Sequence, residues 1–136
     1  MALTDNRYDE RFAAGWQLPL PVAASTQIFK GGFVCLNAAG YLVPASDTAG
    51  LRCVGVARDG SDNSDGSAGE KQVVVVTQGS IVIGKSGAVN ADLGKTAFCV
   101  DDETVALSST NSITAGLIVA VEDASHVRVR FDANCA

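Results

Sequence analysis

The stretch "GSIVIGKSG" (residues 79–87) decides between two folds. It matches the pattern G-x-x-x-x-G-K-[ST] of a phosphate-binding P-loop, which needs flexible backbone between its glycines and a helix directly after it. The matching residues are Gly79, Gly84, Lys85 and Ser86. The intervening residues 81–83 are three β-branched apolar side chains, which favour an extended strand. The stretch therefore predicts a strand that ends in a Gly-Lys-Ser-Gly turn with an exposed Lys85.

The residues around this stretch also argue against a nucleotide-binding enzyme. "QVVVVTQ" (72–78) resembles the strand that precedes a P-loop, and "FCVDDE" (98–103) or "LIVAVED" (117–123) resembles an acidic strand that helps to hold magnesium. However, "GAVNADLGKTAFCV" (87–100) is interrupted by glycine, asparagine and aspartate before a helix of three turns can form. The chain has no clear long amphipathic helix from which to build the βαβ layers of such an enzyme.

Length and charge limit the class of protein further. A chain of 136 residues suits one domain with one core. A net charge of −5 and a pI near 4.6 argue against DNA, RNA or an anionic membrane as the main partner. The first 16 residues carry charges throughout, and no run approaches eighteen apolar residues. We expect a soluble protein that is made in the cytosol.

The cysteines do not have the spacing of a metal site. Cys35, Cys53, Cys99 and Cys135 lie far apart, form no C-x-x-C pair and have one histidine in the chain to assist them. The first three lie within apolar runs, where a free cysteine packs as a small hydrophobic residue. We expect three buried free thiols, with disulfides or a catalytic cysteine as the alternative, an exposed Cys135, and neither a metal ion nor a cofactor.

Two polar features have structural interpretations. In "HVRVRF" (126–131) apolar and polar residues alternate, so His126 is predicted to be a surface strand residue rather than a general base. The loop "RDGSDNSDGSAGEK" (58–71) is acidic, but its carboxylates do not have the spacing of an EF-hand. We expect a solvated hairpin loop, and the sequence leaves open whether the loop binds a cation.

Short apolar runs separated by glycine, asparagine, aspartate and serine predict an all-β fold, a small β-barrel or sandwich. The runs are 28–36, 41–43, 51–57, 72–77, 80–83, 96–100, 104–107, 117–121 and 126–131. Before them, Pro19 and Pro21 favour an extended path and exclude a central strand. We expect an N-terminal arm over residues 1–24 and a single β-rich domain over residues 25–136.

An internal repeat suggests a duplicated β-module. "FVCLNAAGYLVPASDTAGLRCVGVARD" (33–59) aligns with "AFCVDDETVALSSTNSITAGLIVAVED" (97–123) with small gaps. The alignment pairs Cys35 with Cys99, Gly50 with Gly116, and Asp59 with Asp123, and "QVVVV" and "HVRVRF" supply the next strands. Chance similarity between strands rich in valine, alanine and glycine is the alternative.

The strings "GGFVCLNAAGYLVPASDTAGLRCVGVARDG" (31–60) and "EKQVVVVTQGSIVIG" (70–84) resemble the capsid decoration, or cement, proteins of tailed bacteriophages. The resemblance covers roughly residues 28–131 and rests on strand patterns rather than on a catalytic motif. It implies a non-enzymatic virion protein on the outer capsid surface, made in the host cytoplasm, that clamps neighbouring subunits of the major capsid protein. It also implies a homo-oligomer, with a trimer favoured over a dimer.

The apolar residues of the arm are the predicted partner-binding site. Tyr8, Phe12 and Trp16 recur every four residues, so a short helix that ends near Gly15 would place the three rings on one face. Leu18 and Leu20 extend this apolar set. In the alternative, the three rings cap the protein's own barrel. A second function class, a tail-fibre or carbohydrate-binding module, fits the same strands, but the body has few aromatic residues for stacking on sugars.

Overall fold

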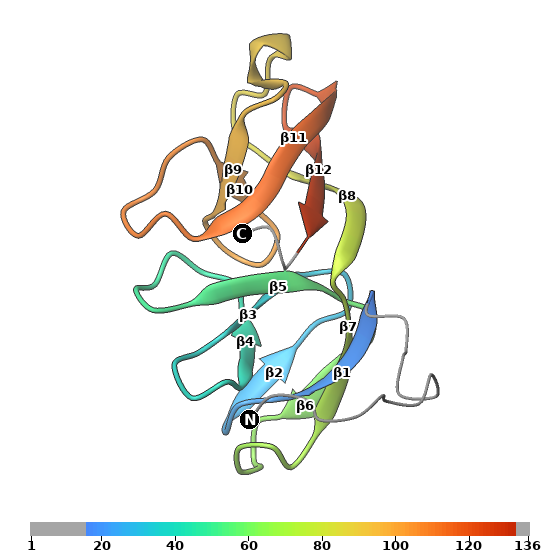
Figure 1. The fold of residues 1–136 in the computed structure, drawn as a ribbon, viewed down its shortest axis with the longest axis vertical. Coiled ribbons are helices and arrows are strands. Elements are labelled where there is room, and N and C mark those ends of the chain that lie inside the picture. The colour runs from blue at the N-terminus through green and yellow to red at the C-terminus, as the bar shows by residue number, and fades with distance from the viewer. Residues whose placement is uncertain (1–15, 133–136) are drawn as a thin grey trace, which may run out of the picture.

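The computed structural model describes residues 16–132, and these form an all-β fold, as the sequence predicts (Figure 1). A short 3-10 turn, η2 (Asn90–Asp92), interrupts the strands. In chain order the strands are β1 (Gln17–Pro21), β2 (Thr26–Ile28), β3 (Phe33–Leu36), β4 (Leu42–Pro44), β5 (Arg52–Ala57), β6 (Ser61–Asn63), β7 (Gln72–Val76), β8 (Gln78–Gly84), β9 (Thr96–Cys99), β10 (Val105–Ala106), β11 (Thr114–Asp123) and β12 (His126–Asp132).

The first sheet has the strand order β1-β7-β5-β3-β4 and forms the lower half of the molecule in Figure 1. Its edge strand β1 pairs antiparallel with β7, and Val22 then forms a bridge with Leu42, the first residue of β4, which curls the sheet toward a barrel. Pro19 and Pro21 fit in β1 because an edge strand has one side without ladder hydrogen bonds. Residues 17–22, which we expected in the arm, therefore lie in this sheet. Residues 1–15 lie outside the described residues.

The second sheet has the order β10-β9-β11-β12-β8 and is bridged in the same way between Gly84 and Thr104. Read from the opposite edge, the first sheet runs β4-β3-β5-β7-β1. The strands therefore correspond one to one, β4 with β10, β3 with β9, β5 with β11, β7 with β12, and β1 with β8. The two sheets repeat one antiparallel module, and β1, at the start of the described residues, is the counterpart of β8.

The strand register corrects one pairing of the internal repeat. Val56 on β5 pairs with Val76, and Leu117 on β11 pairs with Arg130 at the corresponding place. The preceding residues are both glycines: a Cβ on Gly55 would lie 2.0 Å from the Val76 carbonyl oxygen, and one on Gly116 would lie 2.2 Å from that of Arg130. Gly55 is thus the counterpart of Gly116. Gly50, which the sequence alignment pairs with Gly116, lies in the turn before β5.

The sequence alignment also pairs Cys35 with Cys99, and this pairing is wrong by one residue. Val34 is opposite Gly55 and Ala97 is opposite Gly116, so Leu36, and not Cys35, is the counterpart of Cys99. A shift of one residue reverses the face to which a strand side chain points. Cys35 therefore points away from the interior of its own sheet and toward the second sheet.

Two groups of buried side chains make up the core. The interior of the first sheet consists of Val22, Ile28, Val34, Leu42, Ala57, Val73 and Val75. The larger group joins residues of the first sheet, such as Phe33 and Cys53, to the interior of the second, such as Ile118 and Phe131. The rings of Phe33 and Phe131 meet edge to face, with centroids 5.8 Å apart. The larger group is therefore a core that the two sheets share, and the smaller group fills the first sheet alone.

Candidate functional site

The Gly-Lys-Ser-Gly turn has a structural role. Strand β8 extends through Gly84, as expected, but Lys85 is buried, which corrects the prediction of an exposed lysine. Its Nζ lies 3.0 Å from Asp92 Oδ2 and also donates to the backbone carbonyl of Ser86. A hydrogen bond from the backbone N–H of Val89, together with the Lys85 ammonium, lowers the pKa of Asp92. The lysine turns inward to close the loop between β8 and η2, and it does not point outward to a phosphate.

His126 begins β12, next to a serine and an aspartate that resemble a catalytic relay in composition but not in geometry. Its Nδ1 lies 3.0 Å from Asp123 Oδ1 and 3.4 Å from the Ser125 hydroxyl. A Ser-His-Asp relay needs the serine and the aspartate on opposite ring nitrogens. Here both contact the same nitrogen, and the side chains of His126 and Asp123 are exposed. The prediction that His126 is a surface strand residue is confirmed.

The acidic loop folds back on itself around Asn63. The Asn63 Nδ2 donates to the carbonyls of Ala23 and Ser67, while its buried Oδ1 has no hydrogen-bond partner. The nearby carboxylates accept local hydrogen bonds, Asp62 from Ser64 and Glu70 from the Ser67 backbone N–H. The Lys71 ammonium reaches the Asp62 carbonyl and lines the same pocket as these groups. The positive charge of the Lys71 ammonium would repel a cation in this pocket.

Of the predicted partner-binding residues, Trp16, Leu18 and Leu20 are described, whereas Tyr8 and Phe12 lie outside the described residues. Trp16 is 50% exposed and Leu18 is 40% exposed, while Leu20 is half-buried against the interior of the first sheet. The Trp16 carbonyl accepts a hydrogen bond from the Thr77 backbone N–H, which fixes the start of β1. We call Trp16, Leu18 and Leu20 the β1 edge surface.

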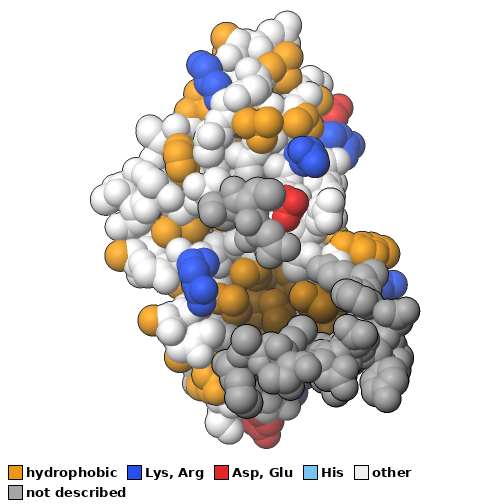
Figure 2. Space-filling view, in the orientation of Figure 1, with side chains coloured by type: hydrophobic (Ala, Val, Ile, Leu, Met, Phe, Trp, Pro, Cys, Tyr) orange, Lys and Arg blue, Asp and Glu red, His pale blue; other side chains and the backbone are white. Residues whose placement is uncertain are grey.

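The β1 edge surface is more exposed than the matching surface of the second sheet, where the edge strand is β8. By register, Leu18 is opposite Val75 and its counterpart Ile81 is opposite Val129. Ile81 packs against the shared core, but Leu18 remains exposed. Figure 2 shows hydrophobic side chains gathered over the middle and lower part of this face of the molecule. Trp16 and Leu18 therefore present apolar surface to solvent.

Three of the four cysteines meet in the core, which the sequence did not indicate. Cys35 on β3, Cys53 on β5 and Cys99 on β9 are buried and free, as expected, but their Sγ atoms also lie within 4.8 Å of one another. We call these residues the thiol cluster. The three cysteines lie 18 and 46 residues apart in the sequence, which is not the spacing of a metal-binding motif. They meet because β3 pairs with β5 and the second sheet packs against both strands.

The three thiols differ in acidity. Hydrogen bonds from Cys35 and Cys99, followed by one from the Gly55 backbone, lower the pKa of Cys53 below its ordinary value. The hydrogen bond to Cys53 is the main cause that raises the pKa of Cys35 to about 12, and contact with the other two thiols raises that of Cys99. The contacts among the three thiols therefore favour ionisation at Cys53 over ionisation at Cys35 or Cys99.

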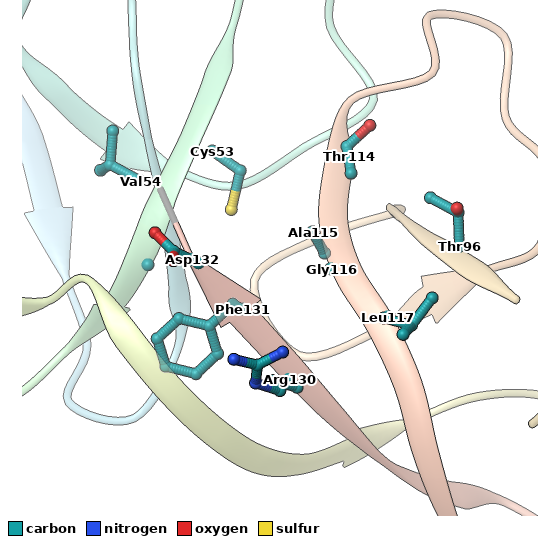
Figure 3. Close-up of a pocket in the computed structure, with 11 residues that line it drawn as sticks. Cys53, Val54, Thr96, Thr114, Ala115, Gly116, Leu117, Arg130, Phe131 and Asp132 are labelled. Atoms are coloured by element: carbon teal, nitrogen blue, oxygen red, sulfur yellow. The ribbon is translucent and has the colours of Figure 1, made fainter. Parts of the chain in front are cut away.

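A pocket of about 280 Å³ opens beside the thiol cluster, where β5 of the first sheet meets β11 and β12 of the second. Figure 3 shows the Cys53 side chain directed into the space between these strands, with Phe131 and Asp132 opposite it. Cys53 is 8% exposed, whereas Cys35 and Cys99 are fully buried. Cys53 is thus the cysteine of the cluster nearest to solvent.

Comparison with known proteins found no matching family model, no similar curated protein and no similar solved structure. Within residues 16–132, no helix is long and apolar enough to cross a membrane.

Proposed function

We propose that this chain is a non-enzymatic virion protein that binds the outer surface of a phage capsid and stabilises contacts between subunits of the major capsid protein. We propose further that it acts as a homo-oligomer, with a trimer favoured over a dimer. The observation that supports this function best is the β1 edge surface. It combines an exposed apolar strand with a chain segment that precedes it and carries two more aromatic residues.

The β1 edge surface can supply useful binding energy. Half of a tryptophan and two-fifths of a leucine leave about 200 Å² of apolar surface in water, on the order of 5 kcal/mol when buried at about 25 cal/mol per Å². Ordering of side chains and loss of rigid-body freedom subtract from this figure. Such a contact becomes strong when the copies are joined in one oligomer, because the second and third contacts then form at a high effective concentration.

A carbohydrate-binding module is the second candidate, because Trp16 and Phe29 expose their rings, at 50% and 59%. Sugar binding needs such rings together with polar groups that fix the sugar's orientation. Binding to a glycan array that is weakened by Phe29→Ala, together with no binding to capsids, would support this candidate over the first.

Cosedimentation with phage heads stripped of the protein tests the capsid proposal. We expect the wild-type protein to pellet with the heads, and the double variant Trp16→Ala/Leu18→Ala to lose at least tenfold in affinity. The control is Val82→Ala/Val119→Ala, which removes exposed apolar side chains from the second sheet and should bind normally. Failure of the wild-type protein to bind, or equal binding by the two double variants, would contradict the proposal.

A further inference from the structure

We propose that Cys35, Cys53 and Cys99 form a binding site for one copper(I) ion, which enters through the pocket between the two sheets. This site lies in the core and is independent of capsid binding. It rests on three observations: the three sulfur atoms converge, oxygen and nitrogen side-chain ligands are not part of the cluster, and one cysteine borders a pocket.

The sulfur positions suit a single ion. Three sulfurs around one metal at about 2.3 Å, the length of a metal–thiolate bond, lie about 4 Å apart. The three Sγ atoms already lie within 4.8 Å of one another, so shifts of less than about 1 Å within the present fold bring them into coordination. The ligands come from β3 and β5 of one sheet and β9 of the other, which means that the ion would tie the two sheets together.

The ligand set selects the type of metal. Among the described residues, the only group of three or more His, Cys, Asp or Glu side chains placed to hold an ion is this set of three cysteines. Structural zinc is almost always held by four ligands, whereas soft thiolates favour copper(I), which is stable with three sulfur ligands in a plane. Magnesium and calcium need oxygen ligands, which the cluster does not supply. Copper(I) therefore fits this donor set best.

Cys53 borders the pocket, whereas Cys35 and Cys99 are fully buried, so an entering ion would reach the Cys53 sulfur first. Backbone hydrogen bonds reach the Cys35 sulfur from Ser46 and the Cys53 sulfur from Gly55. The ion would bind first to Cys53, and the protons of the three thiols would leave to solvent as the three copper–sulfur bonds form. No electron is transferred, because copper remains in the +1 state. The backbone hydrogen bonds partly offset the negative charge that remains on the complex.

Titration of the reduced full-length protein with copper(I) in the absence of oxygen, against a chromogenic copper(I) chelator, tests the site. We expect one ion per chain, an ultraviolet thiolate-to-copper band, three sulfur neighbours by X-ray absorption, and a higher thermal midpoint. Absence of binding at chelator concentrations that leave free copper(I) would show that the three thiols only fill the core. Tighter binding of zinc than of copper(I) would overturn the assignment of the metal.

Two variants locate the site. Cys53→Ala, at the pocket side of the cluster, should fold and should weaken copper(I) binding at least tenfold. Cys135→Ser is the matched control, because it removes the one cysteine outside the thiol cluster, and it should bind like the wild-type protein. Unchanged binding by Cys53→Ala, or lost binding by Cys135→Ser, would overturn the three-cysteine site. Should Cys53→Ala fail to fold, Cys99→Ala replaces it with the same expected loss.

Discussion

The two sheets have the same strand order but differ at their edge strands. In the second sheet, β8 carries Ile81 and Ile83, which pack into the shared core. In the first sheet, the counterpart β1 carries two prolines, and its Leu18 remains exposed. The second sheet therefore packs these two apolar side chains of its edge strand inward, whereas the first leaves part of the matching surface exposed. Under the proposed function, this exposed surface is the one that binds the capsid.

The sheets also differ in the connection that leads to their fourth strands. Between β11 and β12 the chain turns through Ala124 and Ser125, fixed by a hydrogen bond from the Ser125 backbone N–H to Asp123. Between β5 and β7 it runs through residues 58–71, which include β6, and β6 pairs with β2 in a small additional sheet. Surface loops accept insertions at low entropic cost. The long connection adds structure to the first sheet without altering its strand order.

The largest effect that we expect comes from the two equivalent glycines. Gly55→Ala and Gly116→Ala should each destabilise the protein by at least about 3 kcal/mol, because the new Cβ would meet a backbone oxygen of the neighbouring strand at 2.0 or 2.2 Å. Urea denaturation measures the loss. The control is Gly50→Ala, which has positive φ but open space and should cost about 1 to 2 kcal/mol. If Gly116→Ala were as mild as Gly50→Ala, Gly116 would not lie against the Arg130 carbonyl, and the register that makes it the counterpart of Gly55 would be wrong.

The next effect concerns Lys85, which follows β8 in the second sheet. The corresponding residue after β1 in the first sheet is Val22, which carries no charge. Lys85→Ala should lower the thermal midpoint by roughly 10 °C, since it leaves the buried Asp92 carboxylate without its ion pair. Differential scanning calorimetry measures the change. Lys95→Ala, at an exposed lysine three residues after Asp92, should change the midpoint little.

The pH dependence of thermal stability distinguishes the contribution of the Lys85–Asp92 ion pair from that of side-chain packing. The pKa of Asp92 is lower in the folded protein than its ordinary value of 3.8, so its contribution to stability is complete above pH 3.8 and is lost as the pH falls through the folded value. The difference in midpoint between the wild-type protein and Asp92→Asn should therefore shrink below about pH 4. A difference that stays constant down to pH 2 would assign the effect to packing.

The sequence predicted the elements that depend on local pattern. Alternation and β-branched runs placed most of the strands, and residues 81–83 distinguished a strand from a P-loop. It did not predict what depends on pairing across the fold. The alignment of Cys35 with Cys99 was wrong by one residue because it matched residue types, whereas the strand pairing makes Val34 equivalent to Ala97. The thiol cluster and the burial of Lys85 follow from contacts between strands distant in sequence.

The smallest effect that we expect tests the difference between the two edge strands directly. Ile81→Ala should cost about 1 to 2 kcal/mol, because Ile81 packs against the shared core and the side chain leaves a partial cavity. Leu18→Ala, at the matching position of β1, should change stability by less than about 0.5 kcal/mol, because that leucine is 40% exposed. Chemical denaturation at matched protein concentration measures both. Equal losses at low concentration would mean that β1 is as much a part of the core as β8. A loss for Leu18→Ala that grows with protein concentration would instead indicate that a second copy of the chain covers the β1 edge surface, because association then contributes to the wild-type stability.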